Sequence, residues 1–280
     1  MDIPFAQVDV FSAEPYLGNP VAVVLDAARL SEEAMQRLAV WTNLSETTFI
    51  LPPTDARADY RLRIFTPGGE LPFAGHPTLG SAHAWLENGG VPHQPGRIIQ
   101  QCNAGLIELR LGDQLAFSAP QTTRSGPVDE ELVSQLAAGL RVACEKIIDH
   151  QWVVNGPNWL CLRLQSSDEV LGLKPDFTAL AALKMDIGII GFYPEGSSYA
   201  YEVRAFASEN GRMIEDPVTG SLNASVAQWL HKLGAVPDSY YASQGTCVGR
   251  AGRVKIDADP DGAIWVGGAT RTLIHGSIAF

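Results

Sequence analysis

The chain has 280 residues, of which 46% are hydrophobic, and its formal net charge is −11. This length favours two domains, and the apolar content is sufficient for one or two cores. The acidic balance argues against a nucleic-acid surface, which would need clustered Lys and Arg, and no run of 18 apolar residues could form a membrane span. We therefore expect neither a nucleic-acid partner nor a membrane partner.

The N-terminus has no basic region of the kind that begins a signal peptide. The four cysteines show no CxxC spacing and are typical of reduced thiols, so we expect a cytoplasmic protein. The histidines form no HxH or HExxH pair, and residues 67–69 lack the spacing of a nucleotide loop. We predict no metal site.

The first half of the chain predicts strands over residues 3–11, 21–25, 47–51 and 60–66. A helix is expected over residues 31–43, because Ser31 is a favoured N-cap and Glu32 and Glu33 follow in the first turn. Three short strands are predicted after the second helix, over residues 97–101, 105–111 and 114–118.

That second helix, predicted over residues 77–87, is the central feature of the half. Pro77 suits the first turn of a helix, where its missing N–H is not needed. His76 then lies at a helix start, where free N–H groups attract anions. The helix is apolar on most sides, and its residues are small at Gly80, Ser81 and Ala82. We expect a sheet to surround it.

The second half repeats this order of elements. Its predicted strands cover residues 150–154, 158–164, 187–193, 199–207, 240–243, 252–257 and 263–267. Its predicted helices cover residues 175–184 and 217–233. A further helix over residues 129–141 has no counterpart in the first half.

Short motifs support a duplication. Arg204-Ala-Phe206 matches Arg63-Ile-Phe65, and residues 216–221 match residues 76–81, so that Asp216 corresponds to His76. Pro77 and Pro217 are 140 positions apart, which is half the chain.

Because strands and helices do not alternate regularly, we expect an α+β fold rather than a doubly wound sheet. We predict two pseudo-symmetric domains, each a β-sheet wrapped around a central helix. Residues 1–118, completed by residues 271–280, would form the first domain. Residues 119–270 would form the second, with the junction near residues 119–127.

Three acidic or basic side chains are candidates for catalysis. If the two helix starts converge, His76 and Asp216 would face each other, and Glu46 would enter from the loop after the first helix. Structural roles are the alternatives: a turn residue for His76, an N-cap for Asp216 and a surface carboxylate for Glu46. Recurrence of a titratable residue before Pro favours function for His76 and Asp216. For Asp186, the formal counterpart of Glu46, we favour a structural role.

At these residues the chain resembles the phenazine-biosynthesis isomerase (PhzF-like) family. The resemblance runs nearly end to end and rests on several motifs, which are Gly18-Asn-Pro-Val-Ala-Val, Asn43-Leu-Ser-Glu-Thr-Thr-Phe49, Phe65-Thr-Pro, Phe73-Ala-Gly-His-Pro-Thr-Leu-Gly80, Glu215-Asp-Pro-Val-Thr-Gly-Ser221, Gln244-Gly and Gly249-Arg250. It implies the diaminopimelate-epimerase fold, an active site between the two domains, a homodimer and no cofactor.

The resemblance also implies residue roles. Glu46 would be the proton-shuttling carboxylate, and His76, Asp216 and Ser221 would contact and assist the substrate. Gly75 and Gly220 would bind it through their backbone.

Epimerases and racemases of the same fold use a cysteine at each of the two helix starts. Here those places hold Ala74 and residues 217–218, so a two-thiol mechanism is not available.

We therefore expect a cofactor-independent isomerase that transfers a proton on a small carboxylated metabolite. The alternative is a non-catalytic protein that binds a small metabolite with the same helix ends, and a third possibility is a cysteine-dependent racemase. The helix N-terminus should lower the pKa of His76, while contact with Asp216 would oppose that shift.

Overall fold

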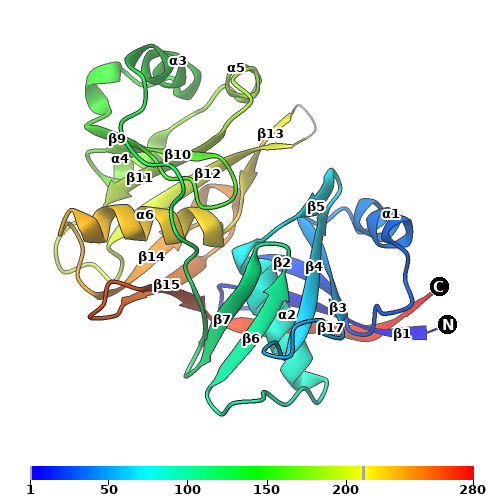
Figure 1. Cartoon of the computed structure of the whole chain (residues 1–280). Helices are drawn as coiled ribbons and strands as arrows, with labels where there is room; N and C mark the ends of the chain where they lie inside the picture. The colour runs from blue at the N-terminus through cyan, green and yellow to red at the C-terminus, as the bar shows by residue number, and fades with distance from the viewer. Residues whose placement is uncertain (1, 210–211) are drawn as a thin grey trace. The chain divides into compact units, whose positions relative to one another are not determined.

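The computed structural model describes residues 2–209 and 212–280. The chain forms two compact units (Figure 1). The first contains the residues up to Ser118 together with Gly267–Phe280, and the second contains Ala119–Val266. Both combine strands with helices, so the α+β class is confirmed.

The first unit contains eleven of the elements labelled in chain order. They are β1 (Asp2–Val10), β2 (Asn19–Val24), α1 (Glu32–Thr42), β3 (Glu46–Leu51), β4 (Tyr60–Thr66), β5 (Gly69–Leu71), α2 (Gly75–Glu87), β6 (Arg97–Cys102), β7 (Gly105–Leu111), β8 (Leu115–Ser118) and β17 (Thr270–Ala279). Ser31 caps α1 by accepting a hydrogen bond from the Ala34 N–H, as the sequence predicts.

The sheet of this unit runs in the order β17, β1, β2, β3, β4, β6, β7, β8. The β2–β3 and β4–β6 pairs are parallel and the others antiparallel, and β5 forms a hairpin with β4. The end of the chain returns to pair with its beginning, because β17 runs antiparallel to β1 along its whole length.

Helix α2 lies inside this sheet. It packs against β1, β2, β3, β4, β8 and β17. A Cβ atom on Gly80 would lie 2.4 Å from Val21 Cγ1, so only glycine allows this approach of the helix to β2. Ser81 Oγ and Thr48 Oγ1, 2.8 Å apart, join the helix to β3. The predicted arrangement of a sheet around a central helix is confirmed for this unit.

The second unit contains the remaining elements. They are α3 (Glu130–Leu140), η1 (Cys144–Lys146), β9 (Asp149–Trp152), β10 (Trp159–Leu164), α4 (Ser167–Gly172), α5 (Phe177–Ala181), β11 (Asp186–Phe192), β12 (Tyr201–Glu209), β13 (Arg212–Asp216), α6 (Gly220–Lys232), β14 (Ser239–Gln244), η2 (Thr246–Val248), β15 (Gly252–Ala258) and β16 (Ile264–Gly268), whose last residues belong to the first unit.

The strand pairings of the second unit repeat those of the first. The β10–β11 and β12–β14 pairs are parallel, like β2–β3 and β4–β6. The β11–β12, β12–β13 and β14–β15 pairs are antiparallel, like β3–β4, β4–β5 and β6–β7. The predicted duplication is therefore present in the topology.

The register of the predicted repeat is wrong at the second helix, because α6 begins at Gly220 and not at Pro217. Both α2 and α6 have 13 residues, and aligning their starts pairs Gly75 with Gly220 and His76 with Ser221. Asp216 ends a strand instead, in the place of Leu71. The cause is the hairpin before α6, whose strands have 9 and 5 residues, against 7 and 3 before α2.

The helix predicted over residues 175–184 is also shorter than expected. It is reduced to α5, where Asp176 caps the chain by accepting from the Ala179 N–H. A separate helix, α4, precedes it and is capped by Ser166. Pro175 divides the two, because proline restricts the residue before it to extended conformations.

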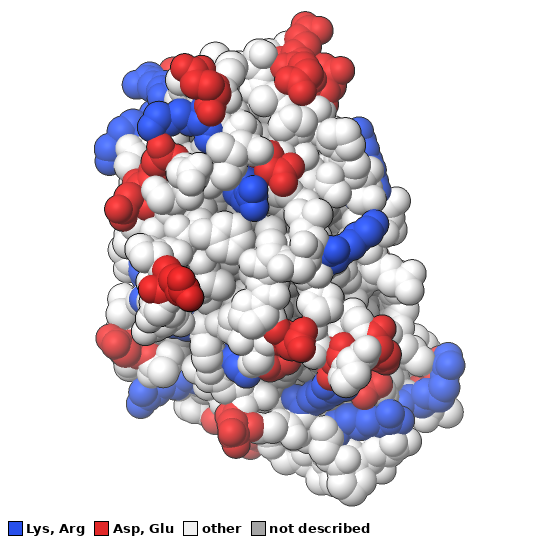
Figure 2. All heavy atoms as spheres, turned by 90° about the vertical axis from the view of Figure 1, so that its left-hand side faces the viewer, with Lys and Arg blue, Asp and Glu red and all other residues white. Residues whose placement is uncertain are grey.

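The surface carries acidic and basic side chains interspersed over a largely uncharged background on the face shown in Figure 2. Among residues 2–209 and 212–280, no helix is both long enough and apolar enough to cross a membrane.

Candidate active site

A carboxylate and an imidazole meet in the first unit. Glu46 is the first residue of β3 rather than part of a loop, and it lies opposite Val21 in the parallel strand β2. His76 is the second residue of α2. Glu46 Oε2 lies 3.2 Å from His76 Nε2, and the two side chains are only 13% and 5% exposed. Two of the predicted catalytic residues are thus direct neighbours.

The start of β2, together with the turn before it, holds the imidazole from its other side. Asn19 is fully buried, and its Nδ2 lies 3.3 Å from His76 Nδ1. The turn is fixed by Asp9, whose Oδ2 accepts a hydrogen bond from the Gly18 N–H. A Cβ on Gly18 would lie 2.2 Å from the Val10 carbonyl oxygen, so this position requires glycine. The ring is thereby oriented with Nε2 toward Glu46.

Burial controls the charge of this imidazole. Desolvation lowers the pKa of His76 to about 3, and a hydrogen bond with the Pro20 backbone opposes the shift only in part. The sequence left the net direction open between the helix N-terminus and Asp216, whereas in the structure the pKa is lowered and burial is the largest cause. At neutral pH the ring is uncharged, so it can both donate and accept a hydrogen bond.

A second polar cluster surrounds the start of α6 in the other unit. Asp216 Oδ2 accepts a hydrogen bond of 2.5 Å from Thr219 Oγ1. Gln244, at the end of β14, accepts at Oε1 from the Thr219 N–H and from Asn223 Nδ2. Its own Nε2 donates to the Asp216 carbonyl and to Thr219 Oγ1. Gln244 thus fixes the segment that carries Asp216 to the sheet.

Ser221 occupies the position in α6 that His76 occupies in α2. Its Oγ accepts a hydrogen bond of 3.1 Å from Trp159 Nε1, and its carbonyl accepts one from Asn155 Nδ2. Because the indole is the donor, the Ser221 hydroxyl hydrogen can be directed to another acceptor.

Both helices begin with glycine. Gly75 and Gly220 are the first residues of α2 and α6, and neither N-cap residue, Ala74 or Thr219, makes a side-chain capping bond. First-turn N–H groups without such caps can bind an anion. The sequence predicted the position of the second racemase cysteine at residues 217–218. Because α6 begins at Gly220, that position is held by Thr219 instead. Neither helix start carries a thiol.

Asp186, the counterpart of Glu46, has a different environment. Glu46 begins β3 and Asp186 begins β11. The residues that follow them pair in the same way, Thr47 with Phe65 and Ile187 with Phe206, so the two strands are equivalent. Asp186 accepts a hydrogen bond from the Ser208 N–H, and burial raises its pKa.

Sequence reasoning missed Asn19 and did not assign a role to Gln244. Both residues lie inside motifs of the family resemblance, Gly18-Asn-Pro and Gln244-Gly, and nothing else in the sequence indicated a role for them. Within the described residues no group of three or more His, Cys, Asp and Glu side chains could hold a metal ion.

Together, the fold and this site define an α+β protein of duplicated units, with a buried carboxylate–imidazole pair at the start of a sheet-enclosed helix. Such pairs are typical of acid–base enzymes. The phenazine biosynthesis-like protein family (PhzC-PhzF) matches residues 8–277, and the chain therefore belongs to that family.

Two relatives cover nearly the whole chain. Antisense-enhancing sequence 1 of Schizosaccharomyces pombe is 38% identical, over 97% of each chain. Trans-2,3-dihydro-3-hydroxyanthranilate isomerase of Pseudomonas aeruginosa is 34% identical, over 92% of this chain and 91% of the relative.

Solved structures share the fold. A PhzF-family phenazine biosynthesis protein of Bacillus anthracis matches with a TM-score of 0.83 at 24% identity over 100% of both chains. A hydroxyproline epimerase of Agrobacterium vitis matches with a TM-score of 0.61 at 13% identity, over 99% of this chain and 92% of that one. The expected epimerase-like fold is confirmed.

Proposed function

We propose that this protein is a cofactor-independent isomerase that moves a proton between two carbon atoms of a small carboxylated metabolite. The observation that carries the proposal is the 3.2 Å approach of Glu46 Oε2 to His76 Nε2 in a buried setting. Family membership and relatives that are named isomerases support the reaction class.

Glu46 is the proton carrier in this proposal. Its carboxylate takes a proton from a substrate carbon, and the electron pair of the broken C–H bond forms a new double bond to the adjacent carbon, which displaces the π electrons of the double bond already present there. That double bond migrates, and the carbon at its far end takes the proton back from Glu46. The substrate keeps all its atoms, and no electron acceptor is required. His76 is uncharged at neutral pH, and we propose that its Nε2, 3.2 Å from Glu46 Oε2, forms a hydrogen bond with the carboxyl group during the reaction.

Asp216, Ser221 and the two helix starts would bind and orient the substrate. The N–H groups at Gly75 and Gly220 suit a substrate carboxylate. The Ser221 hydroxyl is a further donor, and Asp216 is an acceptor held in place by Thr219. We propose that these groups and the Glu46–His76 pair act on one substrate molecule in a site between the two domains.

A thiol mechanism has less support. Ala74 and Thr219 stand where a two-thiol racemase would need cysteines. Cys161 is fully buried, and burial raises its pKa far above the ordinary value of a thiol.

The test uses heavy water and trans-2,3-dihydro-3-hydroxyanthranilate, the substrate in the name of the Pseudomonas relative. Product carbon should acquire deuterium in an enzyme-dependent way, detected by mass spectrometry, and Glu46→Gln should abolish this exchange. The assay extends to other small unsaturated carboxylates. Exchange that persists in Glu46→Gln at the wild-type rate would remove the mechanism.

The competing function is metabolite binding without catalysis. The name of the Schizosaccharomyces relative denotes no enzyme, which is a reason to test this alternative. A protein that only binds a metabolite would be thermally stabilised by its ligand and would exchange no carbon-bound proton.

Family membership is also our reason to propose a cytoplasmic homodimer. Sedimentation equilibrium should give a mass of twice 30.1 kDa. A monomer at micromolar concentration would contradict the dimer.

A further inference from the structure

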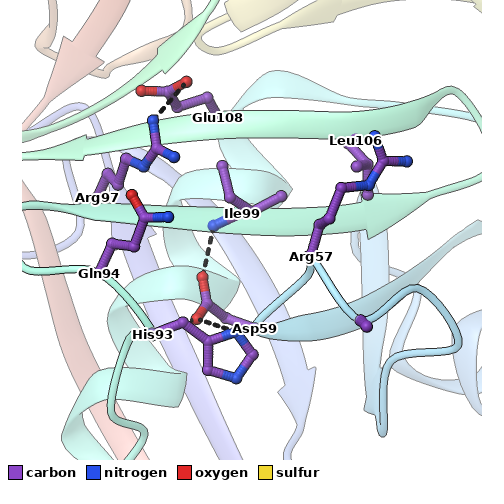
Figure 3. Close-up of a pocket in the computed structure, with 9 residues that line it drawn as sticks. Arg57, Asp59, His93, Gln94, Arg97, Ile99, Leu106 and Glu108 are labelled. Atoms are coloured by element: carbon purple, nitrogen blue, oxygen red, sulfur yellow. Dashed lines mark hydrogen bonds and ion pairs between the residues drawn. The ribbon is translucent and has the colours of Figure 1, made fainter.

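A separate pocket of about 610 Å³ lies in the first unit, beside the β6–β7 hairpin and the chain segments before β4 and β6 (Figure 3). Polar and charged side chains dominate its lining, and those used below are Arg57, Asp59, His93, Gln94, Arg97 and Glu108. None of the residues assigned to the isomerase site lines it. The comparisons and the proposed reaction leave it without a role.

Asp59 organises one wall of this pocket from a buried position, since its side chain is 2% exposed. Its two carboxylate oxygens accept hydrogen bonds of 2.6 Å from the backbone N–H groups of His93 and Ile99. Its Oδ1 also lies 3.5 Å from His93 Nδ1. The negative charge of Asp59 is thus satisfied within the protein, and it orients an imidazole that is itself 59% exposed.

Arg97 provides a cation that the protein pairs only weakly. Its Nη1 lies 3.7 Å from Glu108 Oε2, beyond the length of a hydrogen bond. Its Nε is buried and has no hydrogen-bond partner among the described residues, whereas the side chain as a whole is 41% exposed, so the terminal nitrogens are the donors that a ligand can reach. By contrast, Arg57 is held by Asp55 through bonds of 3.0 and 2.7 Å. Arg97 therefore has donors to offer to a ligand.

We propose that this pocket is a second binding site, which takes a small anion through its carboxylate or phosphate group. Arg97 forms the principal contact, because a guanidinium presents paired donors that match both groups. The Gln94 amide supplies a neighbouring donor from the segment before β6. Glu108 competes with the anion for Arg97, so its carboxylate weakens binding.

The site can be tested by titrating the protein with inorganic phosphate and, separately, with citrate, at an ionic strength held constant with sodium chloride. Backbone amide shifts of residues 93, 94 and 96–99 report occupancy. We expect saturable shifts there, and an apparent dissociation constant at least tenfold higher in Arg97→Gln. Arg141→Gln is the matched control, because it breaks a single exposed ion pair, with Asp176, in the other unit. It should titrate like the wild type.

Glu108→Gln is a second variant with the opposite expected effect: it should tighten anion binding several-fold. Misfolding could weaken binding but could not produce this gain. Saturation by phosphate alone identifies a phosphate site, and saturation by citrate alone a carboxylate site. Equal affinities of wild type and Arg97→Gln, or weaker binding by a folded Glu108→Gln, would overturn the proposal. None of these readouts depends on isomerase activity, so the two proposals fail independently.

Discussion

The carboxylate of Glu46 and the imidazole of His76 lie 3.2 Å apart, although one begins a strand and the other lies in the first turn of a helix. The contact exists because β2 and β3 are parallel neighbours that α2 crosses at close range. We propose on this basis that the carboxylate is the proton carrier and the neutral imidazole its partner.

Replacing the carboxylate is the most direct test of this pair. Glu46→Gln should lower the isomerisation rate by about 10²–10⁴-fold, the usual contribution of a positioned acid–base group. The rate is measured by deuterium incorporation at saturating substrate. Asp186→Asn is the matched control, since Asp186 begins the equivalent strand of the other unit but bonds to the Ser208 backbone. Equal losses in both variants would indicate a general structural effect.

Stability should depend on pH through His76. The pKa of His76 is about 3 in the folded protein against 6.5 ordinarily, so between these values the unfolded chain binds more protons. Stability must therefore fall as the pH drops from about 6.5 toward 3. The unfolding free energy is measured by urea unfolding at several pH values between 3 and 6.5. Its slope against pH should be steeper in the wild type than in His76→Gln by up to about 1.4 kcal/mol per pH unit. Parallel slopes would mean that His76 is protonated in the folded state.

The pH dependence of the rate should be bell-shaped, with the acidic limb set mainly by Glu46. In His76→Ala that limb should persist with a lower maximum. If it disappears in His76→Ala and stays unshifted in an active Glu46→Asp enzyme, His76 is the base instead.

The two hairpins carry equivalent ion pairs with unequal burial. Arg204 and Glu215 are each 6% exposed, and Arg204 also donates to the carbonyls of Val170 and Leu173. Removing one partner of such a pair leaves a buried charge, so Arg204→Ala should cost about 3–5 kcal/mol of unfolding free energy. Arg63→Ala should cost less, because its pair with Glu70 is 14% and 20% exposed. Equal losses in urea unfolding would contradict this ranking.

Gln244 should act as a positioning residue for Asp216. Gln244→Leu removes the bonds to the Asp216 carbonyl and to Thr219, and we expect a fall in kcat of up to about 10²-fold with a smaller change in KM. Gln228→Leu is the control, because Gln228 lies on α6, the helix that Gln244 contacts at its start, but bonds instead to Pro120 and Thr122. It should lower thermal stability and leave kcat unchanged. A fall in kcat that is equal in both variants would assign Gln244 a purely structural role.

The sequence alone was enough for several of the local elements and for the family. Ser31 caps a helix as predicted, and Asp129 caps the helix expected over residues 129–141, because an N-cap depends on a side chain and backbone a few residues away. The sequence also predicted the duplicated order of strands and helices, since each unit repeats the same hydrophobic patterns. The motif around His76 was sufficient to predict a helix start with a titratable side chain.

The register of the second helix was decided only by tertiary structure. Two Pro-x-x-Gly-Ser segments look equivalent, yet α6 starts at Gly220, because the longer β12–β13 hairpin carries Asp216 to the end of a strand. Which residue corresponds to His76 depends on strand pairing across the hairpin, and that pairing is not a local property of the sequence.

Long-range packing also decided which groups meet. Glu46 faces His76 because two strands and a helix come together, and the pKa of His76 falls because that packing excludes water. β17 forms from an exposed, mixed-polarity segment because β1 offers it hydrogen bonds from the opposite end of the chain. Such contacts combine residues far apart in sequence, so their energy has no signature in any single stretch, whereas caps and turns are stabilised by their immediate neighbours.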